Sequence, residues 1–513
     1  MTLSGNGKGD AANKLAITTV VMLATFMSAL DGTIANVALP HIQGSVQASA
    51  DQITWVLTSY IVAAAIMTPL TGFLADKLGR KLVFLISVLG FTAASVLCGM
   101  ATSLAEIVAF RLLQGVFGAA LIPLSQAILL DINPPEKHGQ AMAIWSAGAV
   151  VGPIIGPVLG GWLTDNLSWR WVFLINLPVG LLTAFGVFLF LSEKRATEKR
   201  RFDFLGYISL IAGIGGFQMM LDRGPGQDWF SSLEIWSYLI TGVIGLWVFV
   251  VQIATAKRPF IDKALLADVN FSTTSLFGFF TGVLLFSSMA LLPSMMQNLL
   301  GYPVQFSGLV SMPRGIGSFI TMFAVGQLMG RINVKLILAV GLAMSAFSLW
   351  LMTHFSLGMD TRLIVISGFF QGVSMGLIFV PLSTIAFSTI NPKYRTEGAG
   401  LFTLIRNIGS SVGISVMQAR LVSGLEAHRT ALAAHARPDN PIYQAYLTAP
   451  FSLDAPAGLV AFSGMVNRQA SMLAYNDDFQ LMLTLTFVCF PLILIMRTPK
   501  RAARNEMIHA AVD

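Results

Sequence analysis

Charged residues are rare in this 513-residue chain: only 11% are Asp, Glu, Lys or Arg, whereas 55% are hydrophobic and the mean hydropathy is +0.72. A soluble globular chain carries about 25% charged residues, so this composition excludes a soluble protein. Cysteine is also scarce, and Cys98 and Cys489 both lie in apolar segments, which excludes a disulfide framework. No cleavage signal follows the short polar start, so we expect the first apolar segment to remain as a membrane helix.

Several functional motifs are missing as well. The chain has no Gly-x-x-x-x-Gly-Lys-[Ser/Thr] phosphate loop, which argues against ATP as an energy source. It has no His-Glu-x-x-His and no Cys-x-x-Cys, which argues against a membrane metalloenzyme. We therefore expect no enzyme activity, no cofactor and no metal ion.

Long apolar runs are what the chain does contain. A helix needs about 20 apolar residues to cross about 30 Å of hydrocarbon, and fourteen runs meet this requirement. The sequence thus predicts an all-α integral membrane protein with fourteen spans. The expected spans are 15–39, 52–75, 81–101, 104–130, 141–163, 170–192, 203–221, 235–255, 271–293, 306–328, 334–354, 361–386, 396–420 and 479–497.

The positive charges identify the side of the membrane on which the termini lie. The loops on the side of both termini hold 22 of the 32 Lys and Arg residues, including all twelve lysines, and the other side holds seven arginines. Arg111, Arg314 and Arg406 fall within spans. By the positive-inside rule, we expect both termini in the cytoplasm. The net charge of +7 therefore reflects topology and does not indicate nucleic-acid binding.

Charged breaks divide the spans into six, two and six. The expected parts are a six-helix bundle over 1–192, a charged linker with two extra helices over 193–256, and a second six-helix bundle over 257–513. Such internal duplication is typical of transporters. The longest segment outside the spans, about 421–478, is predicted on the external side. It is either a loop without a specific role or a docking surface for a partner.

Asp31 is the only one of the 25 carboxylates that we expect deep inside a span. A buried charge in lipid costs about 2.5–3.5 kcal/mol on insertion scales, so such a residue invites a functional hypothesis. Arg111, in the fourth span, is expected at a similar depth and is the natural partner. Gln114 lies one turn from Arg111 on the same helical face. The three residues predict a proton-coupling site, and the alternative is an ion pair that only joins two helices.

The fifth span carries glycines at every fourth position with two prolines between them. Small residues at this spacing let another helix approach closely, and each proline deletes a helical hydrogen bond. The span is either a static packing groove or a flexible seam that moves during transport. Its candidate residues are Gly148, Gly152, Pro153, Gly156, Pro157, Gly160 and Gly161.

A short connection between the second and third spans, 72–81, concentrates charge between glycines. Positive charge for topology would explain its basic residues, but it would not explain Asp76 or the glycines. We therefore interpret the segment as a structured gate on the cytoplasmic side. The gate residues are Gly72, Asp76, Gly79, Arg80 and Lys81.

These motifs together resemble the major facilitator superfamily. The chain is similar to its fourteen-span drug:proton antiporter branch, and most of all to EmrB-type multidrug efflux permeases. The 72–81 segment resembles the superfamily's loop motif, 111–115 its fourth-span motif, 148–161 the antiporter signature, and 30–40 the first-span motif of the branch. The second half departs from this pattern, because 326–331 is at best a degenerate copy of the loop motif.

The resemblance implies a proton-coupled exporter of hydrophobic or amphipathic drug-like compounds in a bacterial inner membrane, hence a role in antibiotic resistance. It also implies a periplasmic adaptor protein and an outer-membrane channel as partners, with 421–478 as the candidate docking segment. Two alternatives remain: a dedicated exporter of a metabolite, siderophore or fatty acid, and a membrane receptor or scaffold that transports nothing. The substrate-binding residues, the proton stoichiometry and the oligomeric state are not identified by the sequence.

Overall fold

A computed structural model describes residues 7–53, 55–193, 203–256, 259–329, 331–434 and 456–496 of the chain. Within these ranges the protein is built from α-helices with short 3-10 and π turns. Thirteen helices are long and apolar enough to cross a membrane, and a fourteenth span forms if one bent pair of helices is counted as one. The prediction of an all-α membrane protein with about fourteen spans is confirmed. Most of the charged linker, 194–202, lies outside the described residues.

The helices of the first half pack mainly against one another, and we call them the N-terminal group. They are α1 (Gly7–Val46), α2 (Ala50–Ile53), α3 (Trp55–Met67), α4 (Leu70–Leu78), α5 (Arg80–Met100), α6 (Leu104–Gly118), α7 (Leu121–Ile132), α8 (His138–Asn166), α9 (Trp171–Leu174) and α10 (Asn176–Phe190).

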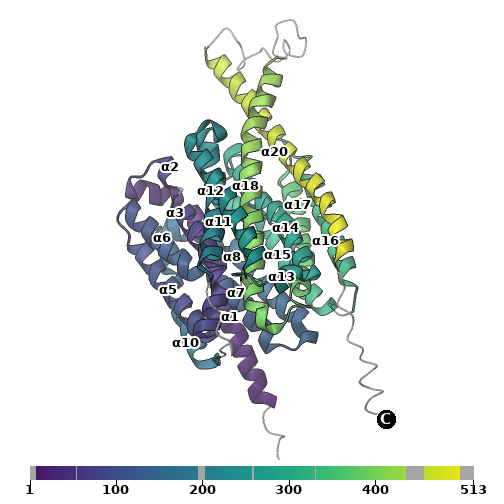
Figure 1. Ribbon diagram of the computed structural model, residues 1–513. Helices are drawn as coiled ribbons and strands as arrows, with labels where there is room; N and C mark the ends of the chain where they lie inside the picture. Colours follow the sequence, from purple (N-terminus) through teal and green to yellow (C-terminus); the bar gives the residue numbers. More distant parts are fainter. Residues whose placement is uncertain are drawn as a thin grey trace, which may run out of the picture.

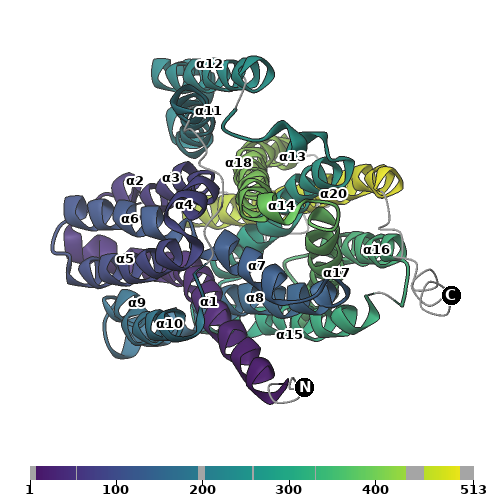
Figure 2. The same cartoon turned by 60° about the horizontal axis from the view of Figure 1, so that its bottom comes forward.

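Two helices follow and pack most extensively on each other: α11 (Phe204–Arg223) and α12 (Leu233–Thr255). In Figure 2 this pair stands apart from the other helices, and α12 exposes large apolar side chains such as Trp247 and Val250 along its length. An apolar, largely uncovered helix of this length suits contact with lipid.

The remaining helices form the C-terminal group. They are α13 (Lys263–Ala267), α14 (Val269–Ser294), α15 (Val304–Leu328), α16 (Val334–Met352), α17 (Thr361–Ala386), α18 (Arg395–Ala434) and α20 (Pro456–Ile495). This group meets the N-terminal group chiefly where α15 packs along α8. The approach is close, since a Cβ atom added at Gly326 of α15 would lie 2.6 Å from the Cβ atom of Ala143 on α8.

Figure 1 shows α1 beginning and α20 ending at the same end of the molecule, which we call the proximal end. At the opposite, distal end, α18 and α20 extend well beyond the other helices. The segment predicted as a long external loop, 421–478, is therefore largely helical: α18 continues to Ala434 and α20 begins at Pro456. The residues between these helices, 435–455, lie outside the described ranges.

Local chemistry explains two features that position the candidate site. Helix α6 begins after Ser103, whose hydroxyl accepts a hydrogen bond from the Glu106 backbone N–H, as expected of an N-cap residue. The second span bends by 57° between α3 and α4. Pro69 lies at this bend, and a proline disfavours helical geometry in the residue before it.

Candidate functional site

Asp31 and Arg111 form an ion pair in the interior of the N-terminal group. The Arg111 guanidinium, on α6, donates from one terminal nitrogen to Asp31 Oδ2 on α1 at 2.6 Å. Both side chains are fully enclosed, at 1% and 0% exposure. Gln114 joins the pair: its amide nitrogen donates to Asp31 Oδ1 at 2.8 Å, and its carbonyl oxygen accepts from Arg111 at 2.8 Å. The structure thus brings together all three residues of the predicted proton-coupling site.

Further groups complete the coordination of the two charges. Asn176, the first residue of α10, donates from its amide nitrogen to Asp31 Oδ1 at 3.1 Å and to Ser95 Oγ at 3.0 Å. Arg111 Nε donates to the Val56 carbonyl at 3.0 Å. The guanidinium also lies 4.3 Å from the centre of the Tyr60 ring, a cation–π distance.

This network joins five helices, α1, α3, α5, α6 and α10, around one carboxylate. Asp31 accepts from three side chains, so its charged form is well supported despite its burial. The sequence interpretation missed Asn176 as a site residue. The available signal was an amide within an otherwise apolar run just before Pro178.

The glycines of α8 face α1 at the level of Asp31. An added Cβ atom at Gly152 would lie 2.6 Å from the backbone nitrogen of Leu30, the residue before Asp31. Gly148, Gly156 and Gly160 likewise contact α1, whereas an added Cβ atom at Gly161 meets nothing within 4 Å. The stripe therefore has four members, and Gly161 is not one of them. Pro153 and Pro157 lie inside α8, which continues from His138 to Asn166 as one helix.

The predicted gate lies at the proximal end, where the two helix groups meet. An added Cβ atom at Gly72 of α4 would lie 3.0 Å from the backbone of Glu397 on α18, so a larger side chain would separate the groups. Gly79, between α4 and α5, has a φ of +94°, a conformation that favours glycine. The structure thus explains why glycine occupies both of these positions of the gate.

Arg80 contributes to a bridge between the groups. Its guanidinium is ion-paired with Asp131, at the end of α7. The other carboxylate oxygen of Asp131 accepts from Arg395, the first residue of α18, at 3.0 Å. The three side chains are 13–14% exposed. One carboxylate of the N-terminal group is therefore shared with an arginine of the C-terminal group.

The remaining gate residues lie beside this bridge. Lys81 donates to the Phe188 carbonyl at 2.7 Å, which ties the start of α5 to the end of α10. Asp76 lies on α4, one turn after Gly72, and is half-buried. The sequence interpretation did not include Asp131, Arg395 or Glu397. Each of them is an ordinary charged residue beside a loop, so nothing in the sequence alone marks it.

The helix that contains most of the last expected span, 479–497, begins earlier than expected. Asp478 lies on α20, inside its membrane-length stretch Val460–Ile495, and is 1% exposed. Its nearest cation is Arg420 on α18, whose Nε lies 3.7 Å from Asp478 Oδ1. The difference arose because the last span was drawn from 479, where hydropathy rises, whereas α20 begins more than 20 residues earlier. Its neighbours Tyr475 and Asn476 contact the distal ends of other helices.

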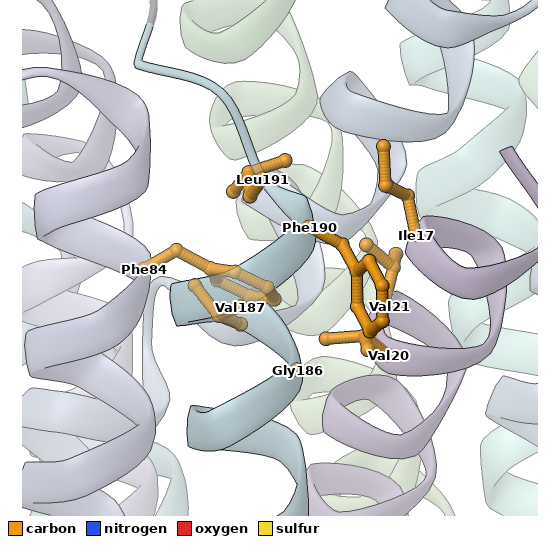
Figure 3. A pocket seen from close by; sticks show the side chains of 8 residues that line it. All are labelled: Ile17, Val20, Val21, Phe84, Gly186, Val187, Phe190 and Leu191. Carbon is orange, nitrogen blue, oxygen red and sulfur yellow. The ribbon is translucent and has the colours of Figure 1, made fainter. Parts of the chain in front are cut away.

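A small apolar hollow lies near the proximal end between α1, α5 and α10. Its lining residues are Ile17, Val20, Val21, Phe84, Gly186, Val187, Phe190 and Leu191 (Figure 3). None of these side chains is polar. Ligand sites generally add a few polar groups that fix orientation, so we do not assign the substrate site to this hollow.

Comparison with known proteins places this architecture in a family. The model of the Major Facilitator Superfamily matches residues 21–414. This match covers most of the chain, from α1 to the middle of α18. The chain belongs to the Major Facilitator Superfamily. Its family and fold are those of a multi-pass membrane transporter rather than an enzyme.

Relatives of this superfamily member include several exporters. It is 36% identical over 438 residues to the multidrug export protein EmrB of Escherichia coli, which covers 85% of this chain and 86% of that protein. It is 34% identical over 487 residues to the fatty acid resistance protein FarB of Neisseria gonorrhoeae, covering 94% and 96%. The resemblance to EmrB-type permeases that the motifs predicted is confirmed.

Solved structures agree on the fold. The human organic anion transporter MFSD10 superimposes with a TM-score of 0.60 at 16% identity, covering 92% of this chain and 99% of its own. The proton:xylose symporter XylE, another major facilitator, gives a TM-score of 0.58 at 13% identity, covering 93% and 96%. At these identities the likeness concerns the fold alone.

Proposed function

We propose that this major facilitator is a proton-coupled exporter of hydrophobic and amphipathic compounds, in which protons drive efflux through reversible protonation of Asp31. The observation that carries the proposal is the enclosed Asp31–Arg111 pair with its Gln114 and Asn176 partners. The similarity to EmrB and related multidrug exporters supports the drug-like substrate class.

Protonation of Asp31 would change the energy of the whole network. A neutral carboxyl no longer balances the Arg111 guanidinium, and an uncompensated buried charge is costly. Arg111 would then favour a conformation in which it gains other partners or water. Because Asp31 is fully enclosed in the present arrangement, a proton reaches it only when the surrounding helices move. Binding a proton and changing conformation are therefore linked at this residue.

The α8 stripe offers a route from that event to the rest of the protein. Gly152 contacts the backbone at Leu30, and the opposite side of α8 packs on α15 of the C-terminal group. A shift of α1 at Asp31 would therefore displace α8 and change its contact with α15 between the two groups. We assign the groups to the two rocking bundles of alternating access, with α11 and α12 as an inserted pair.

The lysine-rich proximal end is assigned to the cytoplasm. The bridge through Arg80, Asp131 and Arg395 then closes the cytoplasmic side in the present conformation. The membrane potential supplies about 2.3 kcal/mol per charge per 100 mV. At about 1.4 kcal/mol per tenfold, each net charge moved supports a roughly fifty-fold gradient. Export therefore needs no ATP.

The function is tested by Asp31→Asn, which keeps the shape and most hydrogen bonds of the site but cannot take up a proton. In proteoliposomes with an imposed pH gradient, we expect gradient-driven dye transport to fall to background. Exchange of labelled for unlabelled dye without a gradient should persist, because it needs only binding and conformational change. The matched control is Asp360→Asn, a carboxylate that is 65% exposed at the start of α17.

Undiminished gradient-driven transport by Asp31→Asn would remove Asp31 from the coupling mechanism. Absence of both transport and exchange in the unmodified protein would instead favour a receptor or scaffold. The alternative of a dedicated exporter retains support from the similarity to FarB, and it predicts transport of fatty acids with little transport of unrelated dyes. A substrate panel in the same proteoliposomes separates these outcomes.

We further propose that the distal extension of α18 and α20 docks a periplasmic adaptor protein, which in turn meets an outer-membrane channel. Val422 lies 27 residues after the start of α18, about 40 Å along a helix, which exceeds the roughly 30 Å hydrocarbon core. Val422 and Val460 on the two helices are 65% and 73% exposed. Val422→Glu combined with Val460→Glu should abolish co-purification of the adaptor and leave transport in proteoliposomes intact. The Val→Ala pair is the control, and unchanged co-purification with the Glu pair contradicts this docking surface.

A further inference from the structure

Two arginines lie buried in the C-terminal group without an acidic partner. Arg314 on α15 is 9% exposed and Arg406 on α18 is 8% exposed. Among the described residues, neither forms an ion pair with a carboxylate. A buried charge that is not paired is costly, so a protein that retains two of them needs another reason for them.

The contacts of the two arginines are incomplete. Arg314 donates from one terminal nitrogen to the Leu285 carbonyl and to Ser288 Oγ, both at 3.1 Å on α14. The Arg406 guanidinium lies 5.5 Å from the centre of the Phe379 ring on α17. Its Nε is buried and has no hydrogen-bond acceptor in the described part of the chain. Arg406 is therefore a buried cation whose Nε donor is not used among the described residues.

Each arginine lies about half the thickness of a hydrocarbon core from the end at which its helix begins. Arg314 follows the start of α15 by ten residues and Arg406 follows the start of α18 by eleven, and the two helices start from opposite ends. At 1.5 Å per residue, each lies about 15 Å inside. Helix α14 connects them: Gly282 packs directly on the Arg406 backbone, and Leu285, one turn later, accepts from Arg314.

Other unused polar atoms occur on the same helices. The hydroxyl groups of Ser287, Ser374 and Thr403, on α14, α17 and α18, are buried without hydrogen-bond partners among the described residues. Gln371 on α17 donates to Ser288 Oγ at 2.6 Å, while its own carbonyl oxygen is unpartnered. Buried polar groups are normally paired, so the described C-terminal helices hold several polar groups that are still able to form hydrogen bonds.

A buried apolar cluster lies beside these polar groups. Phe379, which the Arg406 guanidinium covers, belongs to a cluster with Met322 and Met375 of the C-terminal group and Val150 of α8. Methionine side chains adapt to varied ligand shapes. The cluster spans the contact between the two helix groups, where alternating access would open a path. An elongated apolar tail would meet this cluster next to the cationic groups once the two helix groups separate.

The balance of buried charges indicates that the ligand is an anion. Arg111 already neutralises Asp31, so Arg314 and Arg406 leave the middle of the described helices with an excess of two positive charges. We propose that Arg314 and Arg406 form a binding site for the anionic head group of an amphipathic substrate, such as a carboxylate or sulfonate with an alkyl or aromatic tail. This site deepens the proposed export function and rests on it for its role in transport. Cationic amphiphiles of the same tail length are disfavoured.

Equilibrium binding tests the site directly, with radiolabelled dodecanoate and the full-length purified protein in a non-ionic detergent. We expect Arg406→Gln and Arg314→Gln each to weaken dodecanoate binding about tenfold or more, because a charge-assisted hydrogen bond is lost. Arg406→Lys keeps the charge and should retain most of the affinity. Arg362→Gln, which removes an arginine with an 87% exposed side chain, is the matched control and should have no effect.

Competition defines the chemistry of the ligand. Dodecyl sulfate should displace dodecanoate, whereas dodecyltrimethylammonium should not. Sodium chloride at equal ionic strength should also fail to displace it, and displacement by chloride would reduce the site to a simple inorganic anion site. Dodecanoate affinity that is unchanged in both glutamine variants overturns the proposal.

Transport by the same variants in proteoliposomes separates this inference from the proposed function. If the arginine variants lose dodecanoate binding but no pH gradient drives any transport by the unmodified protein, the site stands and the export function fails. If the unmodified protein exports dyes in a gradient and the arginine variants bind dodecanoate normally, the export function stands and the anion site fails. Size-exclusion profiles matching the unmodified protein confirm that the glutamine variants are folded.

Discussion

The N-terminal helix group balances its buried charge, whereas the C-terminal group has two buried arginines with no acidic partner among the described residues. In the first group, Asp31 accepts from Arg111, Gln114 and Asn176, and Arg111 has further contacts with a carbonyl and an aromatic ring. In the second group, Arg406 contacts the Phe379 ring, and its Nε has no acceptor among the described residues. Buried Arg111 thus has a carboxylate partner in the N-terminal group, whereas buried Arg406 has none among the described residues of the C-terminal group.

This difference suits separate roles for the two halves, a proton site in the first and a ligand site in the second. A carboxylate enclosed by fixed donors suits a proton site, because only the proton changes its charge. Cations with free donors suit a site whose missing partner arrives from outside. Coupling between the two then depends on the contact of α8 with α15, since these helices join the groups along much of their length. Stability measurements on matched arginine variants test the contrast directly.

The largest effect is expected for Arg111→Met, compared with Arg406→Met. Removing Arg111 leaves Asp31 as an unpaired buried charge, and we expect the free energy of unfolding to fall by about 3–5 kcal/mol. Removing Arg406 takes away a charge that has no acidic partner in the described part of the chain, so the free energy of unfolding should stay the same or rise by about 1–3 kcal/mol. Urea titration in non-ionic detergent micelles, free of dodecyl sulfate and dodecanoate, measures both changes.

A double variant provides the control for this pair. Asp31→Asn combined with Arg111→Met removes both charges and should recover most of the stability lost in Arg111→Met alone. Equal destabilisation by Arg111→Met and Arg406→Met would contradict the contrast, because it would mean that Arg406 has a stabilising partner as well. A failure of the double variant to recover would assign the loss to packing around Arg111 instead of to charge.

The main contacts of the N-terminal group could be predicted from the sequence alone. Depth along two antiparallel spans predicted that Asp31 and Arg111 would lie at one level, and the structure places them 2.6 Å apart. Glycine spacing predicted the α8 stripe, since residues four apart share a helical face. These inferences needed only local geometry and the rule that buried charges seek partners.

Contacts between residues far apart in the chain could not be predicted from the sequence. Asp131 and Arg395 are separated by 264 positions, and neither stands in an apolar run that would draw attention to it. Asp478 was misplaced because hydropathy marks where a helix turns apolar and not where it begins. The unsatisfied state of Arg406 could not be predicted either, since the absence of a partner depends on every helix that surrounds it.

Asp131 is the place where the two halves share a charge, and its substitution should give the smallest effect. Asp131→Asn removes two ion pairs whose members are 13–14% exposed, and we expect it to shift the conformational equilibrium by about 1–2 kcal/mol toward opening of the proximal end. That corresponds to a roughly tenfold rise in the open population. Spin labels on Lys77→Cys, in α4, and on Lys393→Cys, two residues before α18, should report a longer distance between the two groups.

Glu136→Gln removes an exposed carboxylate five residues away and should leave this distance distribution unchanged. Gradient-driven transport by Asp131→Asn should slow without being abolished, because Asp31 is intact and only the balance between conformations has moved. If Asp131→Asn instead abolishes transport while the spin-label distances stay the same, Asp131 acts on the proton or the substrate itself. The proton or substrate site would then involve residues at the contact between the halves, and the assignment of separate roles to the two halves would be wrong.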